Sequence, residues 1–236
     1  MSFIITVYTN EGIVMASDSR ITYNNTQTLP DGTIQKNIGV QITDTAYKTF
    51  ICNSRIGLSA CGDASINSAP IAGYIEDFIS KNITEDSSVE EISQKILDYF
   101  SNCAPKLDAN FFIAGYNKND EKQYVSRVYT LKKQIVPEKT DIQGALWDGE
   151  KDILLRLVKN VGIKQTDNTY SDLKQFNIGF NYFTLQDAID FAQYAVDSTI
   201  KTIFFQDRVK TVGGPIDILA IKPSGAFWIQ RKELHA

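Results

Sequence analysis

The spacing of hydrophobic residues changes several times along the chain, and each change predicts a different element. Residues 3–9 are β-branched or aromatic and residues 13–16 are again apolar, with a turn sequence at 10–12 between them, which predicts a hairpin. Residues 24–39 are polar and carry a turn signal at 30–32, so we expect a loop or a mobile hairpin tip there.

Four helices are predicted from apolar residues that recur every three or four positions. The predicted helices cover residues 64–81, 88–103, 148–160 and 185–205. The spacing from Ser88 to Glu91 is that of a capping box, which supports the start of the second helix. The other apolar runs predict strands at residues 46–52, 55–61, 110–116, 123–130, 132–136, 140–146, 216–222 and 226–231.

The order of these elements is strands, two helices, strands, two helices, strands. Such segregation suits an α+β fold in which two antiparallel sheets stack face to face and helices cover the outer faces, a four-layer αββα sandwich. The alternation of strand and helix that marks a parallel sheet is absent. Because no linker or internal repeat divides the sequence, we expect one domain over residues 1–236.

The composition excludes several classes of protein. Hydrophobic residues make up 43% and charged residues 22%, as in a globular protein with a real core. A net charge of −4 argues against nucleic-acid binding, which favours a basic surface. No apolar run approaches the roughly 20 residues of a membrane span, and the start lacks the pattern of a signal peptide. We expect a soluble protein without nucleic-acid or membrane partners.

The three cysteines, Cys52, Cys61 and Cys103, are widely spaced. This pattern predicts thiols in a reducing compartment, hence a cytoplasmic protein, rather than a disulfide framework or a metal site. Residues 213–215 are Gly-Gly-Pro, but no Gly-Lys-Ser/Thr follows them, so they do not predict a phosphate-binding loop. We expect neither a cofactor nor a metal ion.

The histidine content limits the chemistry further. The single histidine, His235, is the next-to-last residue, a poor place for a catalytic group. This argues against catalysis by Ser-His-Asp or Cys-His and against zinc bound by histidines. Any nucleophile here needs a different base.

Residues 2–20 resemble the start of a proteasome β-subunit. That family begins its mature chain with a nucleophilic Thr or Ser, followed by strand, turn, strand and an Asp/Glu-x-Arg. Residues 48–50 and 56–63 are similar to the family's Lys-containing strand and its glycine-rich substrate strand. Residues 212–221 are similar to its penultimate strand, and the Asp-Ser-Thr run at 197–199 resembles the ancestral-β type of bacterial homologue.

The resemblance implies the fold of N-terminal nucleophile (Ntn) hydrolases and assembly into homo-oligomers, in which the helices at 64–81 and 88–103 pack against neighbouring subunits. It also implies site roles, which transfer to Ser2 as nucleophile and base, to Asp18, Arg20 and Lys48, and to Gly62 as oxyanion donor. A buried Lys48 ammonium would lower the cost of a serine alkoxide. Asp18 would keep that ammonium charged and oriented.

The residues support this chemistry by themselves. A serine hydroxyl is a weak nucleophile until a base takes its proton. The α-amine of Ser2, with an ordinary pKa of about 7.7–8.0, is the nearest candidate. Its exposure requires removal of Met1, which the small Ser2 permits. Two segments differ from the family pattern. Residues 144–149 lack the serine that the family places near the nucleophile. Residues 206–212 are longer than the family's Asp-x-x-Ser segment, so Asp207 and Thr211 are only candidates for its Asp and Ser.

Each assignment has a structural alternative. Ser2 could be an ordinary small residue, Lys48 and Asp18 a structural ion pair, Gly62 a turn glycine and Cys61 plain packing. The leading hypothesis is an Ntn amide hydrolase, a self-assembling peptidase that uses Ser2. The alternatives are a non-catalytic subunit of a proteasome-like assembly, or an enzyme for small amides or peptide transfer on the same fold.

Overall fold

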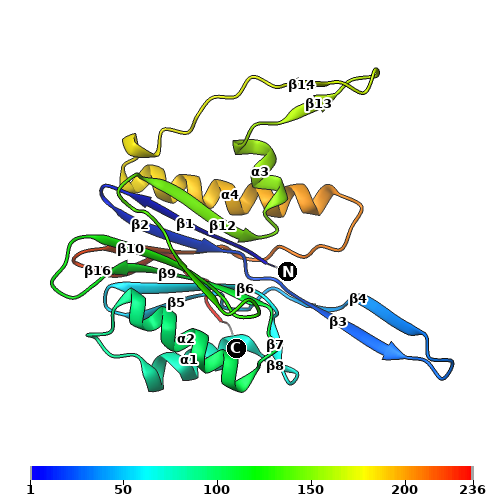
Figure 1. Ribbon diagram of the computed structural model, residues 1–236, viewed down its shortest axis with the longest axis horizontal. Helices are drawn as coiled ribbons and strands as arrows, with labels where there is room; N and C mark the ends of the chain where they lie inside the picture. Colours follow the sequence, from blue (N-terminus) through cyan, green and yellow to red (C-terminus); the bar gives the residue numbers. More distant parts are fainter. Residues whose placement is uncertain (1, 235–236) are drawn as a thin grey trace.

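A computed structural model describes residues 2–234, except for the side chains of 24–27, 36–38, 40 and 41. Two five-stranded sheets stack face to face, and helices cover the outer face of each (Figure 1). Every strand pairing in the two sheets is antiparallel. The predicted four-layer αββα architecture is therefore confirmed.

The first sheet contains the strands at both ends of the described chain. Its order is β12 (Gly144–Gly149), β1 (Phe3–Thr9), β2 (Gly12–Ser17), β15 (Asp217–Lys222) and β16 (Gly225–Gln230). Every residue of β1 and β2 is buried. These strands lie between the second sheet and a helix, so both of their faces are buried and their sequences are mostly apolar, with Thr6, Thr9 and Ser17 as buried polar exceptions.

The second sheet has the order β11 (Gln134–Pro137), β10 (Gln123–Tyr129), β9 (Ala109–Tyr116), β6 (Ile56–Gly62) and β5 (Thr49–Asn53). Helices α1 (Ile71–Asn82) and α2 (Val89–Cys103) cover its outer face. The Ser88 capping box is present at the start of α2, as predicted: the Ser88 hydroxyl accepts from the Glu91 amide, and the Glu91 carboxylate accepts from the Ser88 amide.

Helices α3 (Asp152–Val158) and α4 (Leu185–Phe205) cover the first sheet. Three hydrophobic clusters fill the spaces between the four layers. Alternate residues of β1 divide between two of them: Phe3, Ile5 and Val7 pack toward α4, whereas Ile4 packs between the sheets. Within residues 2–234, no helix has the length and apolar character needed to cross a membrane.

Two sequence predictions in the first half of the chain are wrong in part. Residues 24–39, predicted as a loop or a mobile hairpin tip, belong to a long hairpin of β3 (Ile21–Thr28) and β4 (Ile34–Thr43), which projects from the body (Figure 1); the hairpin is present, and the loop alternative is wrong. The helix predicted from residue 64 begins at Ile71, after β7 (Ser65–Ile66) and β8 (Ala69–Pro70). Asn67 and Ser68 between these strands have φ of 49° and 67°, which ends any right-handed helix there.

The segment from 140 to 184 also differs from the prediction. The strand expected at 140–146 lies later, because pairing of Phe3 with Gly149 and Tyr8 with Gly144 sets its register. The helix expected over 148–160 is shortened to α3. The elements β13 (Gly162–Lys164), β14 (Tyr170–Asp172) and the short 3₁₀ turn η1 (Phe180–Tyr182) were not predicted.

Candidate active site

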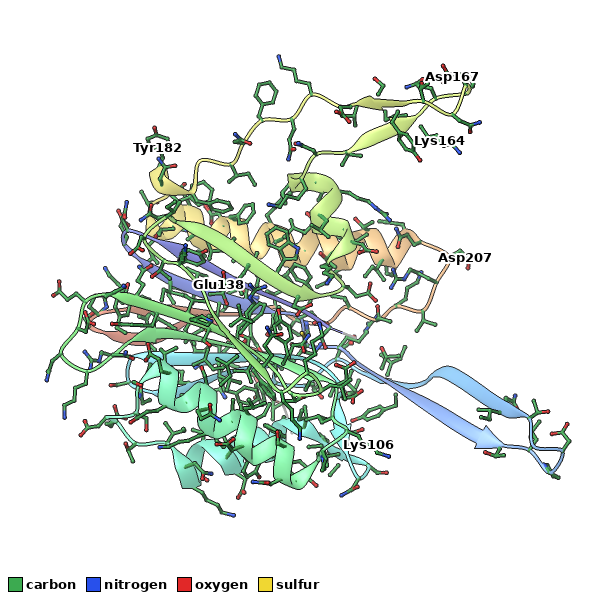
Figure 2. The ribbon with its side chains drawn as sticks, in the orientation of Figure 1. Lys106, Glu138, Lys164, Asp167, Tyr182 and Asp207 are labelled. Carbon is green, nitrogen blue, oxygen red and sulfur yellow. The ribbon has the colours of Figure 1, made fainter. Side chains whose placement is uncertain are left out.

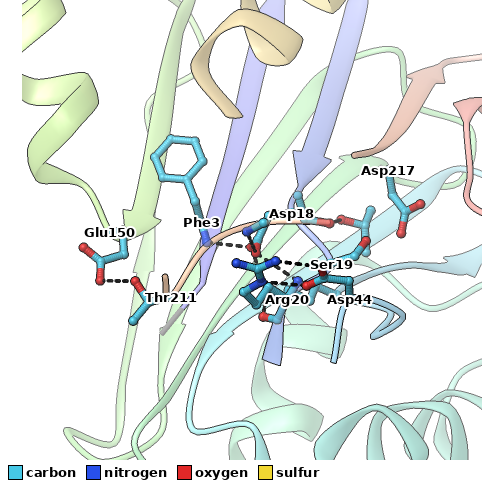
Figure 3. A network of polar contacts seen from close by, with 12 residues as sticks. Phe3, Asp18, Ser19, Arg20, Asp44, Glu150, Thr211 and Asp217 are labelled. Atoms are coloured by element: carbon cyan, nitrogen blue, oxygen red, sulfur yellow. Dashed lines mark hydrogen bonds and ion pairs between the residues drawn. The ribbon is translucent and has the colours of Figure 1, made fainter. Parts of the chain in front are cut away.

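The carboxylate of Asp18 is the centre of the site. Asp18 directly follows β2 and has no exposed surface. Its two oxygens accept hydrogen bonds from four groups: the amides of Phe3 (2.9 Å), Arg20 (3.0 Å) and Gly213 (3.1 Å), and Lys48 Nζ (2.7 Å) (Figure 3). A buried carboxylate is tolerated only when it is paired and hydrogen-bonded. Asp18 therefore connects the backbone at residues 3, 20 and 213 with the side chain of Lys48.

Lys48 directly precedes β5, and its side chain is only 5% exposed. Its Nζ donates to Asp18 Oδ1 and, at 2.5 Å, to the Arg20 carbonyl. Burial lowers the pKa of Lys48, while the charge of Asp18 and its hydrogen bond oppose that shift. Because an ammonium group has three N–H donors, these two contacts leave capacity for one more. The geometry suits a cation held in place for a third acceptor.

The guanidinium of Arg20 has a separate partner. Its Nε and Nη2 donate to the two oxygens of Asp44 at 2.6 and 2.7 Å, a bidentate pair, and Nη1 donates to the Lys210 carbonyl at 3.3 Å. The hydrogen bond that Arg20 donates to Asp44 is the main reason that the pKa of Arg20 is raised. The side chain of Arg20 thus links the segments around Asp44 and Lys210. Its contact with Lys48 is made by the backbone carbonyl instead.

Ser2 lies beside this cluster. It is buried, and its carbonyl accepts from the Glu150 amide at 2.8 Å. Ser2, Lys48 and Gly62 line one pocket of about 20 Å³, which holds about one water molecule. The structure therefore brings together four of the five predicted site residues, with Asp18 behind Lys48. Arg20 is attached to them through its backbone.

Gly62 ends β6 with φ of 103°, a conformation that side chains rarely adopt. A Cβ here would lie 2.3 Å from the Asp108 carbonyl oxygen. The backbone alone therefore requires glycine at this position, which supports the structural alternative. The assignment of its N–H as an oxyanion donor stays a prediction.

No protein-family model and no curated protein sequence matches the chain. Solved structures do. Anbu from Hyphomicrobium sp. strain MC1 aligns with a TM-score of 0.61 and 16% identity over 98% of this chain and 88% of its own. Its Gly-1 mutant gives 0.63 and 16% over 98% and 86%, and Anbu from Yersinia bercovieri, described as an ancestral beta-subunit, gives 0.59 and 12% over 98% and 88%.

The chain has the Anbu fold. This confirms the predicted fold of proteasome-like Ntn hydrolases, and one of the structural neighbours is described as an ancestral beta-subunit. Identities of 12–16% to Anbu carry the fold alone, so the chemistry has to be argued from this chain's own residues.

Within this Anbu-like fold, a polar cluster that sequence reasoning missed adjoins Ser2. Glu150 Oε1 accepts from Arg208 Nη2 at 2.6 Å and from Thr211 Oγ1 at 2.7 Å. The predicted candidate Thr211 thus lies near the site, whereas Asp207 is exposed at the outer turn after α4 (Figure 2). No local signal marked Glu150, because the strand before it was predicted to end at residue 146 and its pairing with β1 is set by the tertiary structure.

Gly149 sets the position of Ser2. Its φ is 92°, and a Cβ would lie 1.8 Å from the Ser2 carbonyl oxygen.

We expect Gly149→Ala to lower the free energy of unfolding by about 3 kcal/mol, because an alanine would strain the backbone there and Ser2 would have to move. The matched control is Gly73→Ala in α1, where a Cβ meets no atom within 4 Å. That change should stabilise by about 0.5–1 kcal/mol. Urea denaturation measures both, and equal effects would contradict this role for Gly149.

Cys61 lines the same pocket but is suited to packing rather than to chemistry. Burial is the main cause that raises the pKa of its thiol, with a smaller contribution from Asp148. Burial likewise raises the pKa of Cys52 to about 12. Both groups therefore stay protonated near neutral pH, and a protonated thiol is a poor nucleophile.

Proposed function

We propose that the protein is an amide hydrolase of the N-terminal nucleophile class, a self-assembling proteasome-like peptidase that uses Ser2 after removal of Met1. Met1 lies outside the described residues, as does His235. The observation that carries the proposal is the pocket shared by Ser2, Lys48 and Gly62, with the Lys48 ammonium held by the buried Asp18. The free buried thiols of Cys52 and Cys61 support a reducing, cytoplasmic setting.

The proposed reaction begins when the free α-amine of Ser2 takes the proton of its own hydroxyl. The oxygen attacks the amide carbon while Lys48 stabilises the developing negative charge, and the Gly62 N–H donates to the tetrahedral oxyanion. The α-ammonium then protonates the leaving amine, which departs and leaves an ester on Ser2. The same amine activates a water molecule, which attacks the ester and restores the serine hydroxyl.

The pocket supports a restricted substrate class. Its remaining wall is largely apolar and includes Ile21, Ala60, Ala64 and Ile71. With a volume of about 20 Å³, it suits a peptide or small amide whose acyl part carries a small apolar side chain.

An electrophile with two reactive positions tests the proposal. A peptide epoxyketone forms a ring with both the hydroxyl and the free α-amine of an N-terminal nucleophile, so its adduct reports both groups. Intact-mass analysis should show a chain that lacks Met1 and gains one adduct, and Ser2→Ala should gain none. A chain that retains Met1, or one that never reacts, would favour a non-catalytic subunit of a proteasome-like assembly. The observation that favours the non-catalytic alternative is the burial of Ser2 in so small a pocket.

Self-association is the second part of the proposal. Large apolar side chains are exposed along α4 and the segment that leads to it: Phe176 (76%), Tyr182 (83%), Phe204 (64%) and Phe205 (83%). Exposed apolar surface of this kind marks interaction sites. Light scattering should therefore give a mass that is a multiple of 26.5 kDa, and Phe204→Ser/Phe205→Ser should reduce it. A species of 26.5 kDa alone at micromolar concentration would contradict assembly.

A further inference from the structure

A second buried ion pair lies close to the first. Lys232 follows β16, and its side chain is 4% exposed. Its backbone N–H donates to Asp217 Oδ1 at 2.9 Å, and its Nζ pairs with Oδ2 of the same carboxylate. Asp217 in turn lies opposite Ser17 in the first sheet, one residue before Asp18. The segment after β16 is thus anchored in the protein interior, next to the candidate site.

The same segment holds an aromatic ring. Lys232 Nζ lies 4.3 Å from the centroid of the Tyr47 ring, and Arg231 Cζ lies 5.0 Å from it. Arg231 Cζ also lies 4.9 Å from the centroid of Trp228. A cation at such a distance is attracted to the face of an aromatic ring. The Tyr47 ring is therefore contacted by two cationic side chains, Arg231 and Lys232.

Tyr47 is part of the pocket beside Ser2 and directly precedes Lys48. It lies between β4 and β5, outside both strands, so no ladder of strand hydrogen bonds holds it. Its ring packs against the hydrophobic cluster between the second sheet and helices α1 and α2, and the contacts from Arg231 and Lys232 add to that support. Because the pocket is small, a shift of this one ring changes its shape.

We propose that Arg231 and Lys232 are positioning residues that clamp the Tyr47 ring as one wall of the pocket, and so determine which acyl side chain fits beside Ser2. This inference rests on the proposed function and names its specificity. With the clamp intact, the pocket accepts a small apolar side chain; with the ring released, it accepts a bulky one. The ion pair with the buried Asp217 holds the Lys232 side chain in place.

The charges around Lys48 limit which variants are informative. Lys48 faces Asp18, Cys61 and Lys232 among the groups that affect its charge. Loss of Lys232 alone would leave Asp217 buried and unpaired, which is costly. The informative variants are therefore Arg231→Leu, which leaves that pair intact, and the double variant Lys232→Met/Asp217→Asn, which removes both charges. Tyr47→Ala removes the wall itself.

The test compares two peptide epoxyketones that differ only in the side chain next to the reactive group, alanyl or phenylalanyl. Adduct formation on Ser2 is followed by intact mass. The wild type should prefer the alanyl reagent, and each of the three variants should shift the ratio of rates toward the phenylalanyl reagent by about tenfold or more. Tyr47→Phe, which keeps the ring, and Arg156→Leu, on the exposed side of α3, serve as matched controls and should keep the wild-type ratio.

A purely structural role would lower both rates together and leave their ratio unchanged, and that result overturns the inference. NMR tests the clamp independently of any reaction: the signals of the Tyr47 ring should shift in Arg231→Leu relative to the wild type. Unchanged ring signals in both clamp variants overturn it as well. If the wild type forms no adduct but the Tyr47 ring signals still shift in Arg231→Leu, the proposed function is refuted and the clamp is supported, so the two failures are distinct.

Discussion

Ser2→Ala is expected to abolish amide hydrolysis and to leave the fold intact. The hydroxyl is the proposed nucleophile, and no histidine occurs among residues 2–234 to support another one. Removal of one small polar atom from the pocket should change the melting temperature little. Steady-state turnover and thermal unfolding measure the two quantities side by side.

Ser2→Thr is the matched control, because it keeps both a hydroxyl and an α-amine. It should retain activity within about tenfold, with the added methyl group as its main handicap in the small pocket. Undiminished turnover in Ser2→Ala would remove Ser2 from the mechanism.

Lys48→Ala is expected to lower the rate per folded molecule by a factor on the order of 10² or more, since it removes the positive charge that stabilises the developing oxyanion. Lys48→Arg should rescue poorly, because a planar guanidinium cannot replace a compact ammonium between Asp18 and the Arg20 carbonyl. Asp18→Asn should lower both rate and stability, because its amide would face the backbone donors of Phe3 and Gly213. Breaking such a buried pair costs about 3–5 kcal/mol.

The control for Lys48 is an ion pair of the same type on the surface. Lys81 and Asp77 pair at 2.6 Å on α1, with exposures of 68% and 42%. Lys81→Ala should cost at most about 0.5 kcal/mol and leave the rate unchanged. If Lys48 and Asp18 were only a structural pair, Lys48→Ala would unfold at a lower temperature with near wild-type turnover per folded molecule. That outcome would move the active site elsewhere.

The local pattern of the sequence was sufficient for the layers of the fold. The apolar runs of β1 and β2 and the capping box at Ser88 are short-range signals, because backbone geometry and capping depend on residues a few positions apart. Pattern and element order together predicted the αββα sandwich. The resemblance at residues 2–20 and 48–63 predicted the pairing of Asp18 with Lys48, which the structure shows as a 2.7 Å ion pair.

Only the tertiary structure decided which distant residues complete the site. Gly213 donates to Asp18 across 195 positions, and Glu150 meets Thr211 across 61. The pairing of Lys232 with Asp217 and its contact with Tyr47 likewise leave no local mark in the sequence. Such contacts depend on the register of β1 with β12 and of β2 with β15, which strand pairing and burial set across the whole domain. Side-chain type along the chain indicates what chemistry is available, and the packing of the sheets decides where it is assembled.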